Sequence, residues 1–376
     1  MKNAAIICEY NPFHNGHKFQ IDEARRITGC DGIVALMSGN TVQRGDFAIL
    51  PKDIRCKAAI SGGIDLVLEN PSLFVLRSAE GYASAAVKTL SALGAIDYLV
   101  FGAEHDNVDD LYKIASFLAN ETDEYKNALS KELSCGASFA AARAKITAKF
   151  LGENSAEILS LPNNLLAVEY LKAIIKQGSP LKPVLIKRKG AMHNSHDSTD
   201  GFASASFIRE AFAQGNDISS CVPYDAYKLY ADKTPVCINN AEMAILSSLC
   251  LMSTDEIANT PDISEGLENK IKTEAMQATS LDALFENVKS KRYAYSRIRR
   301  AVLCAYLGIT KQDASFEPQY IKILDFNEVG QKILNLAKST ATLPLAKSAS
   351  PILRNSDAMA IWKKELEIDR VYNLLK

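Results

Sequence analysis

Two histidines three residues apart, His14 and His17, carry the strongest chemical signal in the sequence. They follow a short apolar segment, Ala4–Cys8, and a connection, Glu9–Phe13, that contains an Asn-Pro step. Histidines at this spacing lie on one face of a helix, so both can donate to the same polyphosphate. A helix that begins here also offers its N-terminal N–H groups and its dipole to an anion, and Gly16 leaves room for a flat base. These features predict a site that grips a triphosphate and stabilises charge on its α-phosphate.

Histidines spaced in this way are more often incidental, and a His-x-x-His pair can also be half of a metal site. The position after the first apolar segment, the preceding Asn-Pro-Phe and the lack of further ligand clusters favour the triphosphate interpretation. The chain has five histidines, and His105, His193 and His196 show no partner pattern. Because the sequence contains neither Gly-Lys nor Gly-x-Gly-x-x-Gly, a P-loop is excluded and a dinucleotide-binding enzyme is disfavoured.

A second cluster suited to phosphate lies near the middle of the chain, where Ala203 is followed by Ser204, Ser206 and Arg209. Two hydroxyls and a guanidinium at the start of a helix make a phosphate clamp. Serines before a helix usually serve only as an N-cap. The cluster therefore indicates a phosphate site only in combination with the pair of histidines.

Composition restricts the class of protein. The chain has 376 residues, 47% of them hydrophobic, and 43 Lys and Arg against 44 Asp and Glu, for a net charge of −1. This mix is typical of a soluble globular protein, and the length favours two or three domains. A charge near zero excludes nucleic-acid binding by bulk electrostatics, so any such contact must come from a local patch.

The same data predict a cytoplasmic location. No stretch approaches the ~18 apolar residues of a membrane span, and Glu9 interrupts the N-terminal apolar run before it reaches signal-peptide length. The eight cysteines are scattered with no C-x-x-C pattern, which disfavours a zinc site and a disulfide framework. Free thiols fit a reducing compartment.

The first half alternates apolar runs with amphipathic stretches, which predicts a doubly wound α/β domain with a parallel sheet. The expected strands are Ala4–Cys8, Gly32–Met37, Asp65–Leu68, Tyr98–Phe101 and Val184–Ile186, and the expected helices between them are Asp22–Ile27, Lys52–Ala59 and Ala79–Leu93. We expect a nucleotide-binding α/β domain over residues 1–215, with a helical excursion at about 111–170. Residues 216–376 are expected to form a second, mostly helical domain, with a loop over 339–354 and a final helix over 356–375.

A basic segment lies in the second half. Six of the 14 residues of Asn287–Arg300 are Lys or Arg, none is acidic, and two tyrosines interleave. Basic side chains neutralise phosphates and aromatic rings stack on bases, so the segment predicts RNA binding. Charge runs are more often solvated helix faces, and tyrosines are commonly buried. The candidate RNA-binding residues are Lys289, Lys291, Arg292, Tyr293, Arg297, Arg299 and Arg300.

The segment Asn11–His17 resembles the HIGH signature of the nucleotidylyl transferase superfamily, which includes class I aminoacyl-tRNA synthetases, and Ser204–Arg209 resembles its second signature. A closer resemblance, over most of the chain, is to the tRNA(Met) cytidine acetate ligase family. The motifs that carry it are Glu9–His17, Met37–Gly39, Gln43–Asp46, Phe101–Glu104, Leu161–Leu165 and Ile186–Arg188.

This resemblance implies a ligase that activates acetate with ATP as acetyl-adenylate. The acetyl group then passes to N4 of the wobble cytidine of elongator tRNA(Met), giving N4-acetylcytidine. It implies that His14 and His17 are catalytic and that the partners are the tRNA anticodon arm and acetate, with no membrane involved. It also implies that residues 1–215 are a nucleotidyltransferase-like, ATP-binding domain and that residues 216–376 are a tRNA-binding domain. Mg²⁺ is expected to arrive with ATP, held by phosphates and water. The implied ATP contacts are Ile6, Ile7, Cys8, Glu9, Tyr10, Asn11, Pro12, Phe13, His14, Asn15, Gly16, His17, Lys18, Phe19, Gly102, Asn163, Arg188 and Lys189, joined by Ser204, Ser206 and Arg209 from the second cluster.

The residues themselves leave alternatives open. Gly102, alone, would be a simple turn glycine, and Arg188 a solvated basic residue. Of Asn163 and Asn164, one is expected to cap a helix and the other to bind nucleotide, and we favour Asn163 for the nucleotide. An adenylyltransferase acting on a small phosphorylated metabolite would use the same ATP site. A non-catalytic RNA-binding protein and a ligase for another carboxylate are further alternatives. Binding of tRNA and release of pyrophosphate discriminate among them.

Overall fold

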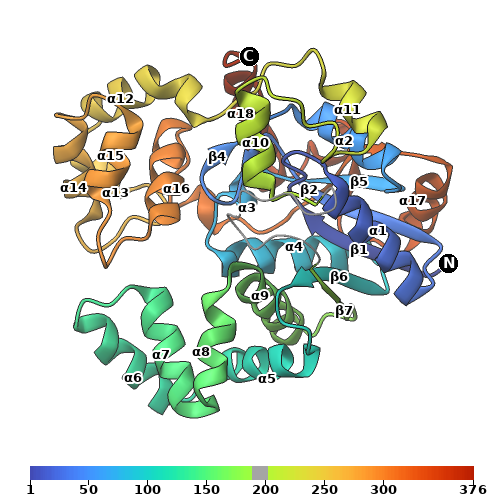
Figure 1. The fold of residues 1–376 in the computed structure, drawn as a ribbon, viewed down its shortest axis with the longest axis horizontal. Coiled ribbons are helices and arrows are strands. Elements are labelled where there is room, and N and C mark those ends of the chain that lie inside the picture. Colours follow the sequence, from blue (N-terminus) through green and yellow to red (C-terminus); the bar gives the residue numbers. More distant parts are fainter. Residues whose placement is uncertain (189–201) are drawn as a thin grey trace.

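The computed structural model describes residues 1–188 and 202–376. Its centre is a seven-stranded sheet in the order β7-β6-β1-β2-β5-β8-β9 (Figure 1). The first five of these run parallel, β8 is antiparallel to β5, and β9 is parallel to β8. The strands are β1 Asn3–Cys8, β2 Gly32–Ser38, β5 Leu66–Asn70, β6 Tyr98–Ala103, β7 Lys182–Lys187, β8 Ile321–Phe326 and β9 Leu345–Ala346. The predicted α/β class and all five predicted strands are confirmed.

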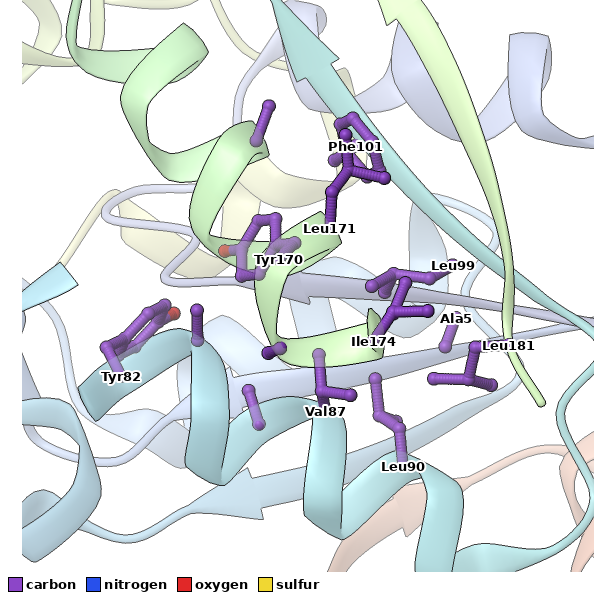
Figure 2. Close-up of a cluster of buried hydrophobic side chains, with 14 of the residues drawn as sticks. Ala5, Tyr82, Val87, Leu90, Leu99, Phe101, Tyr170, Leu171, Ile174 and Leu181 are labelled. Atoms are coloured by element: carbon purple, nitrogen blue, oxygen red, sulfur yellow. The ribbon is translucent and has the colours of Figure 1, made fainter. Parts of the chain in front are cut away.

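Helices cover both faces of the sheet because successive side chains of each buried strand point to opposite sides. Ile6 of β1 belongs to a buried cluster with residues of α1, α2, α10 and α11, whereas Ala5 belongs to a second cluster with residues of α4, α5, α9 and α17. Figure 2 shows part of this second cluster, with Val87 and Leu90 of α4 and Ile174 of α9 on the side of the sheet that Ala5 faces. The helices named here are α1 Asn15–Thr28, α2 Lys52–Ser61, α4 Ala79–Leu93, α5 Val108–Ala119, α9 Pro162–Gln177, α10 Ala205–Ala213, α11 Tyr224–Tyr230 and α17 Glu328–Thr340.

The expected helical excursion before the last parallel strand is confirmed. Between α5 and α9 it contains α6 Asp123–Ser134, α7 Phe139–Leu151 and α8 Glu153–Ser160. No single helix of the described residues is long and apolar enough to cross a membrane. Among the helices that the structure describes, α8 and α9 together have the length and composition of a span, and they are bent by 104° relative to one another.

The C-terminal part is mostly helical, as expected, but it also completes the sheet, so the expected boundary at residue 215 does not separate sheet from helices. Residues 321–326 and 345–346 are β8 and β9, where we expected no strand. β8 has charged residues at its second and fifth positions and β9 has two residues, so neither carries a strong local strand pattern. The expected loop over 339–354 holds β9 and a 3-10 turn, Ser350–Ile352. The final helix, α18 Ser356–Asn373, is confirmed.

The remaining helices form a lobe beside the sheet (Figure 1), and their buried side chains share one hydrophobic cluster with those of α18 and the short α3 Ser72–Val75. The helices of the lobe are α12 Glu242–Leu251, α13 Thr254–Ala258, α14 Leu267–Ala275, α15 Leu281–Val288 and α16 Tyr295–Tyr306, with the turns Ile238–Ala241 and Asp313–Ser315 elsewhere. A small hairpin, β3 Thr41–Val42 and β4 Asp46–Phe47, contacts both α3 and α16. It therefore lies between the sheet and the lobe.

Candidate active site

The connection from β1 to α1 is held in place by contacts from several elements. The Asn11–Pro12 peptide bond is cis and Tyr10 has a φ of +46°. Asn11 Oδ1 accepts a hydrogen bond from Ile49 N at 2.7 Å, and the Phe13 carbonyl accepts one from the hydroxyl of Tyr230 at 3.2 Å. These contacts fix the direction in which the chain enters α1.

His14 and His17 form the first turn of α1. His14 is the N-cap residue, and its Nδ1 accepts from Gly16 N at 3.0 Å. His17 Nδ1 accepts in return from His14 N at 3.3 Å, which completes a capping box built from two imidazoles. The two rings stack with their centroids 3.7 Å apart. The predicted common face of the two histidines is confirmed.

Both imidazoles are neutral and carry their proton on Nε2. Because each Nδ1 accepts from a backbone N–H, it cannot hold the proton of a neutral ring. Burial lowers the pKa of His14 to about 3, and the positive charges of Arg188 and Arg209 add to that shift. Burial also lowers the pKa of His17, with His14 and Arg188 contributing. The site thus presents two neutral Nε2–H donors beside two guanidinium groups.

The N–H groups at the start of α1, which we expected to be available for an anion, are already occupied. Asn15 N donates to Cys221 O at 3.0 Å, and Gly16 N donates to His14 Nδ1. His17 N and Lys18 N both donate to His14 O, at 2.9 and 3.2 Å. The expectation is corrected on this point, since an anion here meets the imidazole Nε2–H groups and the helix dipole rather than free backbone N–H groups.

The start of α10 is more open. Ser204 is its N-cap, accepting from Phe207 N at 3.1 Å, so its hydroxyl has the capping role that Ser-x-Ser usually has. Within residues 1–188 and 202–376, the N–H groups of Ala205 and Ser206 have no hydrogen-bond partner. Arg209 Nη1 donates to Asn11 O at 2.9 Å, which ties α10 to the loop before α1, and its Nη2 donates to Ser206 Oγ at 3.3 Å.

Gly102, Arg188 and the two asparagines also converge at the carboxyl ends of the strands. A Cβ added to Gly102 would lie 3.4 Å from Arg188 Cγ, so the stem of Arg188 covers this glycine. Asn164 Oδ1 accepts from the backbone N–H groups of Glu104 and His105, both at 2.9 Å, and its side chain is buried. Asn163 Nδ2 donates to Glu104 Oε1 at 2.5 Å. Asn164 is therefore structural, which leaves Asn163 as the partly exposed member of the pair.

The other implied ATP residues differ in what they can offer. Most of the strand and loop side chains are buried and can only shape the site, namely Ile6, Cys8, Tyr10, Asn11, Pro12 and Phe13. The partly exposed ones are Ile7, Glu9, Asn15, Gly16, Lys18 and Phe19. Lys18 pairs with Asp22 on the surface of α1. Lys189 lies outside the described residues, as do His193 and His196.

Sequence reasoning missed Arg55, a fully buried residue of α2. Its guanidinium donates to four backbone carbonyls, those of Glu9 at 2.6 Å, Ser38 at 3.1 Å, Leu50 at 2.9 Å and Gly39. It thereby joins the loops that follow β1 and β2 to the segment that precedes α2. The only signal in the sequence was an arginine among small apolar residues in an amphipathic stretch, which is not specific.

The basic segment differs from its expected arrangement, because much of it is bound internally. Arg299 pairs with Asp46 and Arg300 with Asp262, at 2.5 and 2.7 Å. Arg297 donates to Asp262 O and Ser264 Oγ, at 2.8 and 2.7 Å. Tyr293, expected to stack on a base, is instead buried, because its hydroxyl donates to Glu265 O at 2.6 Å and its ring packs in the core of the lobe. The exposed cations of the segment are Lys289, Lys291 and Arg292.

One group of carboxylates in the described chain has the spacing of a metal site, Glu69, Glu365 and Asp369. Two ammonium groups already neutralise it, since Lys52 lies 2.5 Å from Glu69 and from Asp369, and Lys322 lies 2.5 Å from Glu69. Burial raises the pKa of Glu365 to about 7, with the charge of Glu69 adding to the shift. This cluster is an internal ionic network and not a cation site.

A nucleotide site at the carboxyl ends of parallel strands, with two histidines opening the first helix, defines a nucleotidyltransferase-like α/β protein. The family model described as HIGH nucleotidyl transferase matches residues 1–376. The chain is 36% identical to the tRNA(Met) cytidine acetate ligase of Acetivibrio thermocellus over 98% of its own length and 93% of that protein. It is 37% identical to the enzyme of the same name from Clostridium novyi, over 92% and 89% of the two chains.

Solved structures agree with these relatives. The apo structure of Thermotoga maritima TmcAL superimposes with a TM-score of 0.95 at 31% identity, covering 100% of this chain and 95% of that one. The structure of the same protein bound with alpha-thio ATP has a TM-score of 0.93 at 32% identity, with the same coverage. The chain therefore belongs to the tRNA(Met) cytidine acetate ligase family, as the resemblance implied.

Proposed function

We propose that this protein is an ATP-dependent ligase that forms acetyl-adenylate and acetylates N4 of the wobble cytidine of elongator tRNA(Met). The observation that carries the proposal is the pair of neutral, stacked histidines whose Nε2–H groups lie beside Arg188 and Arg209. Relatives that bear this name match nearly the whole chain, and the ATP-analogue complex of one of them supports nucleotide binding. Because its substrate would be tRNA, we place the reaction in the cytoplasm.

In the first step, an acetate oxygen attacks the α-phosphorus, and the bond between that phosphorus and the bridging oxygen of the β-phosphate breaks. Negative charge grows on the non-bridging oxygens of the α-phosphate. His14 and His17 would donate their Nε2–H groups to these oxygens, and since both rings are already neutral donors, no proton has to move. Donors held in place by a capping box need little reorganisation during the reaction.

Pyrophosphate would leave toward α10. The N–H groups of Ala205 and Ser206, the dipole of α10 and the guanidinium of Arg209 together form the site for its charge. Arg209 also donates to the carbonyl of Asn11, so the group that holds the leaving pyrophosphate is tied to the loop that positions His14. Mg²⁺ would be held by the phosphates and water.

Gly102, Asn163 and Arg188 would bind the nucleoside end of ATP. Gly102 lies at the carboxyl end of β6 under the stem of Arg188, and Asn163 is oriented by Glu104. In the second step, the cytidine N4 attacks the acetyl carbon, AMP leaves, and N4 loses a proton. Lys289, Lys291 and Arg292 would hold RNA phosphates during this step.

The proposal is tested by incubating the protein with ATP, [¹⁴C]acetate and elongator tRNA(Met), and by following acetate-dependent exchange of pyrophosphate into ATP without tRNA. We expect exchange that requires acetate, and N4-acetylcytidine at the wobble position only. A folded protein that gives neither product contradicts the proposal. Exchange that depends on a small phosphorylated metabolite instead of acetate would favour an adenylyltransferase.

A further inference from the structure

The β3–β4 hairpin lies between the two regions that the proposed function requires. On the side of the ATP site, Gln43 N donates to Glu9 Oε1 at 2.7 Å, and Ile49 N, just after the hairpin, donates to Asn11 Oδ1 at 2.7 Å. The carbonyl of Asn11 accepts in turn from Arg209. The loop between β1 and α1 is therefore held from the hairpin at two points.

On its other side the hairpin packs directly against the backbone of α16. A Cβ added to Gly45 would lie 2.4 Å from Arg300 N and 2.5 Å from the carbonyl carbon of Arg299, and Gly45 has a φ of +77°. Only glycine meets both conditions. Arg299 Nη2 donates to Asp46 Oδ2 at 2.5 Å, and Arg299 Nε donates to Gly45 O at 3.3 Å.

The hairpin is a stiff connection rather than a free loop. The side chains of Arg299 and Asp46 are only 15% and 30% exposed, so their pair is better defined than an ordinary surface pair. The other carboxylate oxygen of Asp46 accepts from Phe47 N at 2.8 Å and from Ile238 N at 2.7 Å. The Phe47 ring is buried in a hydrophobic cluster that the lobe shares with α3 and α18, and it lies against the ring of Tyr372. The contacts of Gly45 and Asp46 therefore couple the position of the hairpin to that of α16.

Charged groups of both signs lie along this connection. Burial lowers the pKa of Arg209, the carboxylates of Glu9 and Asp46 oppose that shift, and the positive charges of Arg44 and Arg299 add to it, so the guanidinium groups of Arg44 and Arg299 both lie within electrostatic range of Arg209. Arg44 lies at the exposed tip of the hairpin. The exposed cations Lys291 and Arg292 come just before α16, so an RNA strand held on them could approach the phosphate clamp over the hairpin.

We propose that Gly45 and Asp46 are positioning residues for acetyl transfer. They set the distance between RNA bound on the basic segment and the acetyl-adenylate held between α1 and α10. This inference rests on the proposed function and predicts different effects on its two steps. Activation of acetate needs only the ATP site, whereas acetyl transfer also needs the bound RNA at a fixed position relative to that site. Misplacement of a reacting group by about 1 Å can cost about 10²-fold in rate.

The first test compares Gly45→Ala with Gly136→Ala. Gly136 has a similar φ, +87°, but has nothing within 4 Å of an added Cβ, so it controls for backbone strain without displacement. Three quantities are measured for each variant: acetate-dependent pyrophosphate exchange without tRNA, the single-turnover rate of acetyl transfer, and the Kd for tRNA. We expect Gly45→Ala to keep exchange within twofold of the unchanged protein and to lose at least tenfold in transfer rate. Gly136→Ala should retain both.

A milder variant covers the case in which Gly45→Ala fails to fold. Asp46→Asn retains one of the two acceptor oxygens but removes the negative charge that faces Arg299. We expect the rate of acetyl transfer to fall several-fold and the rate of pyrophosphate exchange to stay unchanged. Glu132→Gln is its control, since Glu132 pairs with Lys145 at 2.6 Å in the helical excursion. Melting temperatures show whether each variant is folded.

The outcomes separate the two proposals. If the unchanged protein performs exchange and transfer but folded hairpin variants lose both steps in parallel, or lose neither, the positioning role is overturned while the proposed function stands. If the unchanged protein performs neither step, the proposed function is wrong and the positioning role falls with it. Loss of transfer alone in the hairpin variants supports the inference.

Discussion

The sequence predicts ligand-binding residues in two regions, the first turn of α1 and the basic segment 287–300, and the two regions use these residues differently. In α1, the Nδ1 atoms of His14 and His17 accept the hydrogen bonds of the capping box, which leaves their Nε2–H groups to donate to a ligand. In the basic segment, Arg299 and Arg300 are paired with carboxylates and Tyr293 is buried. Residue type shows which chemistry a motif can perform, but the atoms left over after folding decide which of its members perform it.

The largest expected effect follows from removing one of the two retained donors. His17→Ala should lower acetate-dependent pyrophosphate exchange by about 10²–10³-fold, the usual loss for one donor to a developing oxyanion. Lys57→Ala, at an exposed position of α2, should stay within about twofold. Exchange by His17→Ala within threefold of the unchanged protein would show that the histidines serve only as a cap.

A smaller effect is expected at the clamp on α10. Arg209→Lys keeps the charge but cannot reach both Asn11 O and Ser206 Oγ, so we expect the KM for ATP to rise about tenfold. Arg26→Lys is the matched control, because in the described part of the chain Arg26 pairs with Glu23 alone, on the surface of α1. Steady-state kinetics of pyrophosphate exchange give the KM for ATP of both variants. Equal KM values would show that Arg209 does not bind ATP.

The basic segment can be divided into exposed and internally bound cations by salt titration. Replacing both Lys291 and Arg292 by Ala should weaken tRNA binding severalfold and reduce the slope of log K against log[salt] by about 0.7–0.9 for each lost phosphate contact. Arg297→Ala should instead lower the melting temperature, because Arg297 holds Asp262 O and Ser264 Oγ. The comparison fails if Arg297→Ala changes the salt slope while the double variant leaves it unchanged.

The smallest expected effect is a flat pH profile for activation. The pKa of His14 is lowered to about 3 and that of His17 is lowered well below its ordinary value of 6.5, so both rings are already neutral donors at pH 6.5. The exchange rate should therefore show no loss as pH rises through 6.5, the ordinary pKa of histidine. A fall in rate centred near pH 6.5 that disappears in His17→Ala would mean that a charged imidazole is needed.

The lowered pKa values of His14 and His17 also make the free energy of unfolding depend on pH. Below pH 6.5 the unfolded chain binds protons at these histidines that the folded protein does not bind, so the free energy of unfolding should fall as pH falls from 6.5 toward 3. Each such proton contributes a slope of up to about 1.4 kcal/mol per pH unit. Urea unfolding of His14→Gln should show a shallower slope in this range than the unchanged protein.

Much of the fold could be predicted because its strongest elements carry local signals. The five parallel strands are unbroken apolar runs, and the start of α1 combines Asn-Pro with a histidine pair. β8 could not be found in the same way. It pairs with β5, a segment more than 250 residues earlier in the sequence, and its own six residues include the charged Lys322 and Asp325. Tertiary pairing, not local preference, makes it a strand.

The candidate site was predictable in its types of residue and less so in its contacts. Sequence reasoning favoured Asn163 over Asn164 without access to Glu104, whose carboxylate orients one asparagine and contacts the backbone N–H of the other. Arg55 was missed because its four acceptors are backbone carbonyls, which leave no trace in residue types. Burial of Tyr293 depends on the main chain of Glu265, which no spacing rule relates to it.

The ionic network formed by Lys52, Glu69, Lys322 and α18 has a consequence for the order in which the protein is made. Lys52 and Glu69 emerge early from the ribosome, yet Lys322, which pairs with Glu69, and Asp369, which pairs with Lys52, are synthesised some 250 to 320 residues later. At about 5–20 residues per second, the nascent first half waits many seconds with an open sheet edge and unmatched charges. The edge of the sheet at β5 can therefore be completed only when translation is almost finished, so chains cut short before α18 should unfold more readily than the full-length protein.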